Sequence, residues 1–456
     1  MRGAVFGWLL VASVVAISGY SLLLSVVPLW VAAGGSGALG AGASTGVFMA
    51  TTVGAQLLVP WLLRRFRHRV LLALGLVLLG APTPLLALSG QLVPVLALSA
   101  LRGVGFGVFT VVSNALVAEL APASEHGRAA ARYGMAVGLP QLVLLPAGVG
   151  LVDRIGFEAV FLLGAAPLLG LIALLYVRLE PGAAGARASP AAPVAPTLPP
   201  VAPDARSPDA LSPDAPLDAW PPVAPPVAPP VALAGGRSLA GPSVRGRSSG
   251  WLLVGPVVAM VTCAIAQGGL VTFLPLTEAG SLVVFVALLG TTTGALVGRL
   301  VAGVLGDRGS RRGRLLGPGM VLGALGMVAD LLALLDPAGS ANPGGSANPA
   351  NPANPAGPAN PVGVVALVLG AALVGIGFGL VQNDSLVSMF ALSGPARYST
   401  ASAVWNAAYD TGTGIGAVGL GALAQGFGFR VAFGAVALLL LAGLPALASG
   451  AVRKVN

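Results

Sequence analysis

Five charged residues stand inside long apolar stretches of the sequence, and they are the side chains best placed to do chemistry. They are Arg102, Arg299, Asp330, Asp384 and Asp410. A charge surrounded by lipid is costly, so such a residue faces a water-filled cavity or a partner and marks a functional site. Asp410 lies roughly 15 Å into its stretch, at 1.5 Å per helical residue, close to the middle of a bilayer. A carboxyl at that depth can bind and release a proton, because lost hydration penalises its charged form.

Two further charges compete with or support this role. Arg102 lies at a similar depth, so Asp410 and Arg102 form either a proton-coupling pair or a static salt bridge. Asp384 is the second candidate for proton coupling, and its alternative is a static pairing with Arg299 or with a backbone group. The candidates for proton coupling are therefore Asp410, Arg102 and Asp384.

A polar and aromatic patch surrounds Asp410. Asn406 and Asp410 are four residues apart, as are Trp405 and Tyr409, so the four share one broad helical face. Other apolar stretches contribute four more candidates for the same cavity: Tyr20, Gln267, Gln382 and Asn383. Aromatic walls, amides and one carboxylate suit an amphipathic organic molecule, cations included. The alternative is that Trp405 and Tyr409 only pack between helices.

Membrane helices must hold these residues. Of the 456 residues, 56% are hydrophobic and 9% are charged, whereas a soluble domain carries roughly 25% charged residues. A membrane span needs about 20 apolar residues, and this criterion predicts twelve spans in an all-α integral membrane protein. The predicted spans cover roughly 4–32, 42–63, 69–89, 93–119, 131–152, 158–178, 251–276, 280–305, 314–336, 362–390, 400–424 and 428–450.

The spans fall into two groups of six around a proline-rich segment. Residues 181–250 contain 17 of the 38 prolines, which forbids helix and favours a flexible or polyproline-like linker; the alternative is a docking site for a partner. Residues 337–361 repeat Asn-Pro and predict an external loop. The expected organisation is a six-helix bundle over 1–180, a cytoplasmic linker over 181–250 and a second bundle over 251–456.

The positions of the basic residues predict the topology. All 24 Lys and Arg residues except four lie on the side of the N-terminus; Arg102 and Arg299 are within spans, and Arg154 and Arg430 are on the far side. Basic loops stay in the cytoplasm, so both termini are predicted to be cytoplasmic in a cell membrane. The net charge of +9 then reflects topology and predicts no nucleic-acid partner.

Composition also excludes several kinds of chemistry. One cysteine and two histidines exclude a disulfide framework and a zinc cluster. The only lysine is Lys454, so no phosphate-binding loop with a lysine after its glycines is present. No metal, cofactor, ATP site or enzyme activity is expected. The predicted partners are the lipid bilayer, a small-molecule substrate and protons, and the protein is expected to be a monomer.

Two motifs recur in the two groups of spans. Gly103-Val-Gly105-Phe106-Gly107 and Gly375-Ile-Gly377-Phe378-Gly379 have identical spacing, each in the fourth span of its group, which indicates duplicated halves. After the eighth span, Gly303-Val-Leu-Gly-Asp307-Arg308-Gly-Ser310-Arg311-Arg312 follows. This segment resembles the Gly-x-x-x-Asp-Arg-x-Gly-Arg-Arg signature of the major facilitator superfamily, with Ser310 in place of glycine. A degraded copy follows the second span, with Pro60, Arg64 and Arg67 at the signature's Gly, Asp and second Gly.

This resemblance implies two six-helix bundles related by a pseudo-two-fold axis and secondary active transport by alternating access. It also implies a cytoplasmic latch formed by Gly303, Asp307, Arg308, Arg311 and Arg312. Gly138, Pro146, Gly148 and Gly150 loosely resemble a motif of antiporters, which favours proton-coupled export of small amphipathic or cationic organic molecules over proton-coupled uptake of a sugar or metabolite. Alternatives of a different class are a membrane enzyme acting on lipid-linked substrates and a sensor without transport.

Overall fold

The regular elements of the described residues are all helical. The computed structural model describes residues 2–120, 126–176, 249–277, 280–307, 313–334, 361–393 and 398–451. The helices are α1 (Arg2–Val31), α2 (Gly37–Arg65), α3 (His68–Gly80), α4 (Leu92–Leu120), α5 (His126–Gly164), α6 (Gly170–Tyr176), α7 (Ser249–Phe273), α8 (Ser281–Asp307), α9 (Leu316–Ala333), α10 (Pro361–Ser393), α11 (Tyr398–Ala442) and α12 (Leu444–Ala451). Short 3₁₀ turns at Pro84–Leu88, Ala166–Leu169 and Leu274–Leu276 and a π turn at Ala32–Ser36 join some of them.

Nine apolar helical stretches in the described part of the chain are long enough to cross a bilayer. Three of them, Ala4–Arg65, Arg132–Tyr176 and Thr400–Leu447, exceed the length of one crossing. Each contains a kink at a glycine with positive φ, namely Gly35 (87°), Gly156 (80°) and Gly428 (83°), a conformation that glycine adopts without steric cost. The kinks divide the long stretches near the predicted span boundaries, and the total of twelve crossings stays a prediction.

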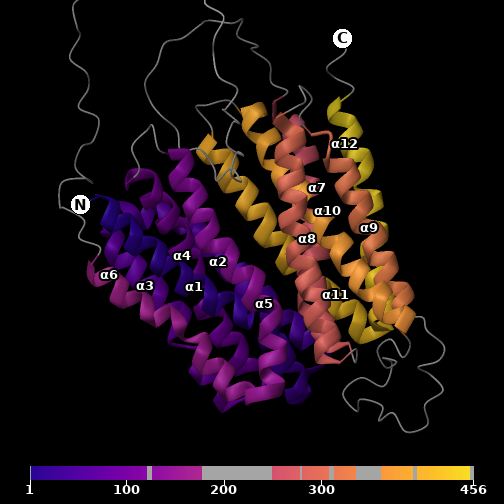
Figure 1. Ribbon diagram of the computed structural model, residues 1–456, viewed down its shortest axis with the longest axis horizontal. Coiled ribbons are helices and arrows are strands. Elements are labelled where there is room, and N and C mark those ends of the chain that lie inside the picture. The colour runs from indigo at the N-terminus through magenta and orange to yellow at the C-terminus, as the bar shows by residue number, and fades with distance from the viewer. Residues whose placement is uncertain are drawn as a thin grey trace, which may run out of the picture.

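The helices form two groups that lie side by side, α1–α6 and α7–α12 (Figure 1). In the first group α1 packs on α5, and α4 packs on both α2 and α3. In the second group α7 packs on α11, and α10 packs on both α8 and α9. The second set of pairs is the first set advanced by six helices, so the two halves share one packing plan. Contacts of α2 with α11 and of α5 with α8 join the halves.

The two glycine triplets explain why this packing plan recurs. In the triplet 103–107 of α4, a methyl group on the first or third glycine would collide with backbone carbonyls of α2, and one on the middle glycine with the backbone of α3. In the triplet 375–379 of α10, the first and third glycines meet backbone carbonyls of α8 in the same way, and the middle one meets α9. Small residues let membrane helices approach this closely. The motif is therefore the contact surface of the fourth helix of each half.

Aromatic packing also repeats, at the place where the first and fifth helices of each half meet. The Trp30 ring near the end of α1 lies 4.8 Å from the Phe157 ring, which follows the kink at Gly156. Phe273 at the end of α7 lies 5.8 Å from Phe429, which follows the kink at Gly428. Equivalent residues thus close equivalent ends, as a duplicated fold requires.

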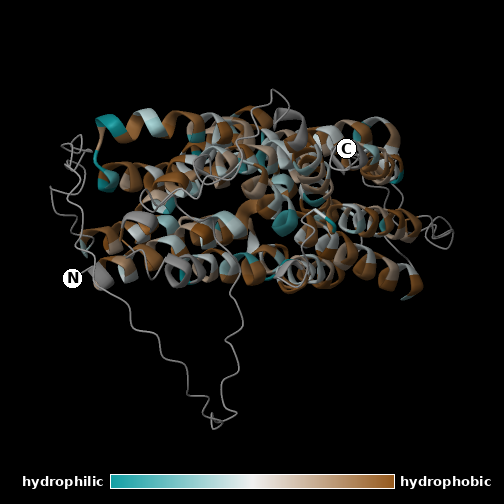
Figure 2. Ribbon diagram, turned by 90° about the horizontal axis from the view of Figure 1, so that it is seen from above, coloured by the Kyte–Doolittle hydropathy of each residue, from teal (hydrophilic) through white to brown (hydrophobic). Residues whose placement is uncertain are grey.

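The outer surface of the helices is apolar, as a lipid-facing surface must be. Leu57 on α2 is 71% exposed and Leu438 on α11 is 68% exposed. Hydrophobic residues dominate the outer helical ribbons (Figure 2). A water-soluble protein does not expose large apolar side chains this extensively, so the all-α membrane fold predicted from composition is confirmed.

Some predicted boundaries need correction or lie outside the described residues. The second helix begins at Gly37, not at residue 42, because its glycine-rich start, although not strongly apolar, packs against α11. The predicted sixth span is interrupted by the 3₁₀ turn Ala166–Leu169, which contains Pro167. The linker 181–250 lies outside the described residues except for its last two, and the loop 337–361 lies outside them except for Pro361.

Candidate functional site

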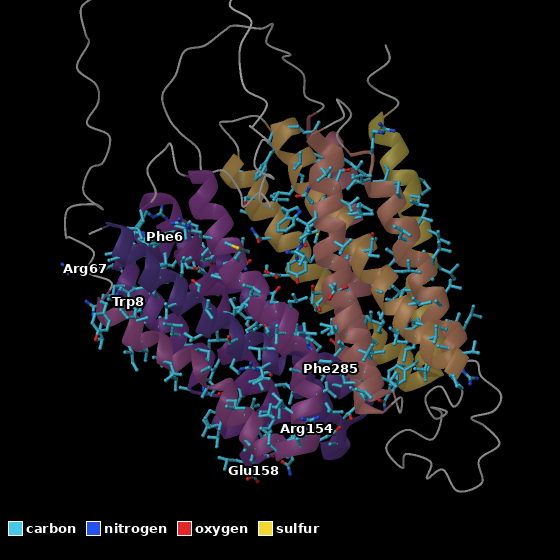
Figure 3. All side chains as sticks on the ribbon, viewed as in Figure 1. Phe6, Trp8, Arg67, Arg154, Glu158 and Phe285 are labelled. Carbon is cyan, nitrogen blue, oxygen red and sulfur yellow. The ribbon has the colours of Figure 1, made fainter. Side chains whose placement is uncertain are left out.

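A cavity of about 560 Å³ lies between the two halves. Residues of α1, α2, α4 and α5 line one side, and residues of α7, α8, α10 and α11 line the other. Figure 3 shows side chains of the two halves projecting toward one another in this region. Six of the seven residues predicted to form a substrate cavity are among the lining residues: Tyr20, Gln267, Gln382, Asn383, Trp405 and Tyr409. The seventh, Asn406, donates a hydrogen bond from Nδ2 to the Ser402 carbonyl of its own helix at 2.9 Å.

One wall of the cavity is aromatic. The ring of Tyr409 lies 5.7 Å from that of Phe378 and 6.3 Å from that of Trp405. The Trp405 indole Nε1 donates a hydrogen bond to Ser385 Oγ at 2.9 Å, which holds the ring in place. Trp405 and Tyr409 therefore pack between helices and also line the cavity, so both interpretations of the sequence apply to them.

Several polar atoms of this lining are buried without a hydrogen-bond partner among the described residues. They are Gln267 Oε1, Thr272 Oγ1, Gln382 Oε1 and Arg299 Nε. A buried polar group without a partner costs about 1–3 kcal/mol. Each such atom calls for an explanation, such as a bound water or ion, and four of the nine found among the described residues belong to residues that line this cavity.

The two halves pack against each other beside the cavity through α2 and α11. This contact, of residues 37–56 with residues 410–425, is called the α2–α11 seam. A methyl group on Gly42 would collide with the Ala417 backbone, and one on Gly46 with the Val418 side chain. The end of the seam at Leu39 and Gln425 is called its outer end, and the end at Gln56 and Asp410 its inner end. At the outer end, the Leu39 N–H donates a hydrogen bond to Gln425 Oε1 at 3.4 Å. The cavity borders the seam at Thr45 and Thr413 and extends toward the beginning of α5 and of α11.

Asp410 lies at the inner end of this seam. Its side chain is 5% exposed, and its Oδ2 accepts a hydrogen bond from Gln56 Nε2 of α2 at 2.9 Å. The carboxyl thus joins the two halves and does not line the cavity itself. Tyr20 of α1, by contrast, lines the cavity.

Arg102 is buried in the N-terminal half and forms no ion pair with Asp410 in this conformation. Its guanidinium lies over the ring of Phe48, 5.6 Å from the centroid, which is a cation–π geometry. Its Nε has no hydrogen-bond partner among the described residues. The static salt bridge weighed for these two residues is therefore absent from this arrangement of the helices.

Asp384 binds backbone groups and lies outside the cavity. Its Oδ1 accepts from the Gly313 N–H at 3.0 Å, and its Oδ2 accepts from the Leu315 N–H at 2.8 Å. These groups directly precede α9, so the carboxylate satisfies donors at a helix start. Of the alternatives weighed for Asp384, the geometry matches pairing with backbone and not with Arg299.

The signature segment is only partly described. Gly303 is a half-buried residue of α8, and Asp307 is the last residue of that helix. Arg308, Arg311 and Arg312 lie outside the described residues. The latch therefore stays a prediction. The roles of the candidate residues for proton coupling and for substrate binding also stay predictions.

Two functional candidates were missed by sequence reasoning. Gln56 bonds to Asp410, yet it is a neutral amide within the predicted span 42–63, and a list of charges alone passes over it. Arg299 was noted as a charge within a span but not assigned to the cavity that it lines. A list of every amide and charge within the spans includes both residues, but only the fold shows what each one faces.

A bundle of membrane helices in two matching halves, with a central cavity lined by both, defines a transporter-type membrane protein. Residues 9–343, more than half of the chain, match the sequence profile of the Major Facilitator Superfamily. The chain belongs to that family, and the resemblance drawn from the signature is confirmed.

Solved structures of transporters share the fold over nearly the whole chain. A bacterial homolog of the human lysosomal transporter Spinster, in an inward-facing and unoccupied conformation, has 13% identity and a TM-score of 0.66, with 98% of this chain and 96% of that chain covered. The nucleoside transporter NupG has 10% identity and a TM-score of 0.64, with 98% and 99% covered. The peptide transporter POT has 15% identity and a TM-score of 0.67, with 97% and 93% covered. No curated protein sequence matches the chain significantly.

Proposed function

We propose that this protein is a proton-coupled secondary transporter that exports small amphipathic organic molecules by alternating access. The observation that carries the proposal is the central cavity of about 560 Å³, lined by both halves and bordered on one side by the α2–α11 seam. A cavity that belongs to both halves opens to the other side of the membrane when the halves rock about it. We place the protein in the cell membrane with both termini in the cytoplasm, as the distribution of arginines favours.

Proton coupling is assigned to Asp410, because this carboxyl links the halves. An ionised Asp410 accepts a charge-assisted hydrogen bond from Gln56 across the seam, and such bonds are stronger than neutral ones. Protonation removes the charge and weakens this link, so the seam can separate. Tyr409, the adjacent residue, lines the cavity, so substrate in the cavity and the proton on Asp410 act on neighbouring positions of one helix.

The character of the cavity supports an amphipathic substrate over a sugar. Most of its lining residues are apolar or aromatic, whereas a sugar needs a dense set of hydrogen-bonding groups for its hydroxyls. Export is proposed on the loose antiporter-like motif at Gly138, Pro146, Gly148 and Gly150. Proton-coupled uptake is the second candidate for the direction of transport.

An enzyme function has less support. Membership of a transporter family points away from it.

The substitution Asp410→Asn tests the proposal in proteoliposomes with an imposed pH gradient. Transport of dansyl-labelled small molecules by the wild type should respond to the gradient. The Asp410→Asn variant should exchange the same molecules downhill but lose the response to the gradient. Asp153→Asn, which removes an exposed carboxyl of α5, is the matched control and should behave like the wild type. Full gradient-driven transport by Asp410→Asn would exclude Asp410 as the coupling residue.

A further inference from the structure

We infer that the central cavity takes an organic anion, with the acid group of the substrate bound by Arg299 and its apolar body against the aromatic wall. This inference rests on the proposed transport function and names its substrate class. It departs from the cationic substrate that the sequence left open, because the carboxylate expected in the cavity is not there.

Charge is the first argument. Arg299 on α8 is the one charged residue among the described residues that line the cavity, and no acidic residue is among them. An uncompensated positive charge at membrane depth needs a counter-charge or water. A cationic substrate would meet repulsion at this site, whereas an anion would supply the missing partner.

The two acidic candidates for proton coupling, Asp384 and Asp410, are already engaged elsewhere. Asp384 accepts two backbone hydrogen bonds before α9. Asp410 accepts from Gln56 within the α2–α11 seam. Tyr409 lines the same cavity, but its neutral phenol does not cancel a full charge.

Hydrogen-bonding geometry is the second argument. The Arg299 Nε is buried and has no partner among the described residues. A guanidinium presents its N–H groups as a planar fork that matches a carboxylate, and two parallel bonds of this kind add strength and orientation. The unpartnered Nε is part of this fork, which is therefore suited to an acid group.

The remaining lining defines the rest of the substrate. Phe378, Tyr409 and Trp405 form an apolar wall, and Gln267 and Gln382 carry unpartnered amide oxygens for one or two donors. The volume of about 560 Å³ is in the range of sites for drug-sized molecules. One guanidinium balances one negative charge, so the substrate class is an amphipathic monoanion, such as an aromatic or long-chain carboxylic acid.

Three probes with the same fluorophore test the inference on the full-length protein in nanodiscs of zwitterionic lipid. Dansylglycine is an anion, dansylglycinamide is neutral and dansylcadaverine is a cation. Binding is measured as energy transfer from protein tryptophan to the dansyl group. Since hydrogen bonds to charged groups are the stronger ones, the wild type should bind dansylglycine at least about tenfold more tightly than the amide.

Variants assign this preference to Arg299. Arg299→Gln should weaken binding of dansylglycine by about tenfold or more and leave binding of the amide unchanged, and Arg299→Lys should restore part of the preference. Arg154→Gln removes an exposed arginine of α5 (Figure 3) that follows the cavity-lining part of this helix, and this variant should bind all three probes like the wild type. The wild-type comparison needs no variant, so it decides the inference even where a variant fails to fold.

Three results would overturn the inference: equal binding of the acid and the amide, tighter binding of the cation, or no binding of dansylglycine at millimolar concentration. Retention of the acid preference in folded Arg299→Gln would also overturn it. Failure of the proposed function looks different, because selective anion binding without any response of transport to a pH gradient contradicts proton coupling alone. Gradient-driven transport of the cation without need of Arg299 contradicts the anion assignment alone.

Discussion

Replacement of Gln56 by leucine should shift the balance between the two orientations of the transporter. Gln56→Leu keeps a side chain of similar size but removes the donor to Asp410, the buried carboxyl at the inner end of the α2–α11 seam. A hydrogen bond to a charged group contributes about 1.5–3 kcal/mol. Because this bond joins the halves, its energy is available only while the seam is closed. Its loss should therefore change the ratio of seam-closed to seam-open protein by roughly ten- to 150-fold.

Spin labels at the end of the two halves away from the α2–α11 seam can measure this change in the ratio of seam-closed to seam-open protein. Arg67 lies between α2 and α3, and Arg314 lies directly before α9; both are exposed. Cysteines at these two positions, in a Cys263→Ala background that removes the buried native thiol, take the labels. Opening of the seam should bring the labelled ends together, so double electron–electron resonance should show a new, shorter distance in Gln56→Leu.

Gln425→Leu is the matched control. Gln425 belongs to the same seam, but it is exposed and accepts a long, 3.4 Å bond from the Leu39 N–H. An exposed neutral bond contributes little, so this variant should change the ratio by no more than about threefold. Identical distance distributions in the wild type and Gln56→Leu, or an equal shift in Gln425→Leu, would refute the assigned role of the Gln56–Asp410 bond.

Two further predictions concern the stability of the C-terminal half. Gly379→Val should destabilise the protein by about 1–3 kcal/mol, since its Cβ would collide with the Ala295 carbonyl of α8, and overpacking of a close contact has such a cost. Thermal unfolding in detergent should show the loss, and Gly54→Ala, at a position with open space around it, should not; similar melting temperatures for both variants would contradict the packing argument. Asp384→Ala should lower the melting temperature more than Asp384→Asn, because alanine leaves the Gly313 and Leu315 N–H groups without an acceptor, at about 1–3 kcal/mol for a buried group. Equal melting temperatures of the two Asp384 variants would exclude the backbone pairing as a stabilising contact.

The sequence alone predicted the membrane fold and the family. The scarcity of charge and the length of the apolar stretches are local properties, and a bilayer accepts only segments that satisfy their own backbone hydrogen bonds. The glycine triplets at 103–107 and 375–379 predicted the repeat, because close helix contacts need small residues at a set spacing along one helix. The signature at 303–312 predicted the family, which residues 9–343 confirm.

Only the tertiary structure decided which of the intramembrane charges faces the cavity. Depth along a helix placed Asp410 near the midplane, but depth does not determine the direction of a side chain or the neighbouring helix. The fold turns Asp410 toward Gln56, Asp384 toward the backbone before α9, and Arg299 toward the cavity. Partners on other helices depend on the rotation of each helix and on which helices become neighbours. Long-range packing sets both of these, so the sign of the charge in the cavity could not be inferred from spacing along the chain.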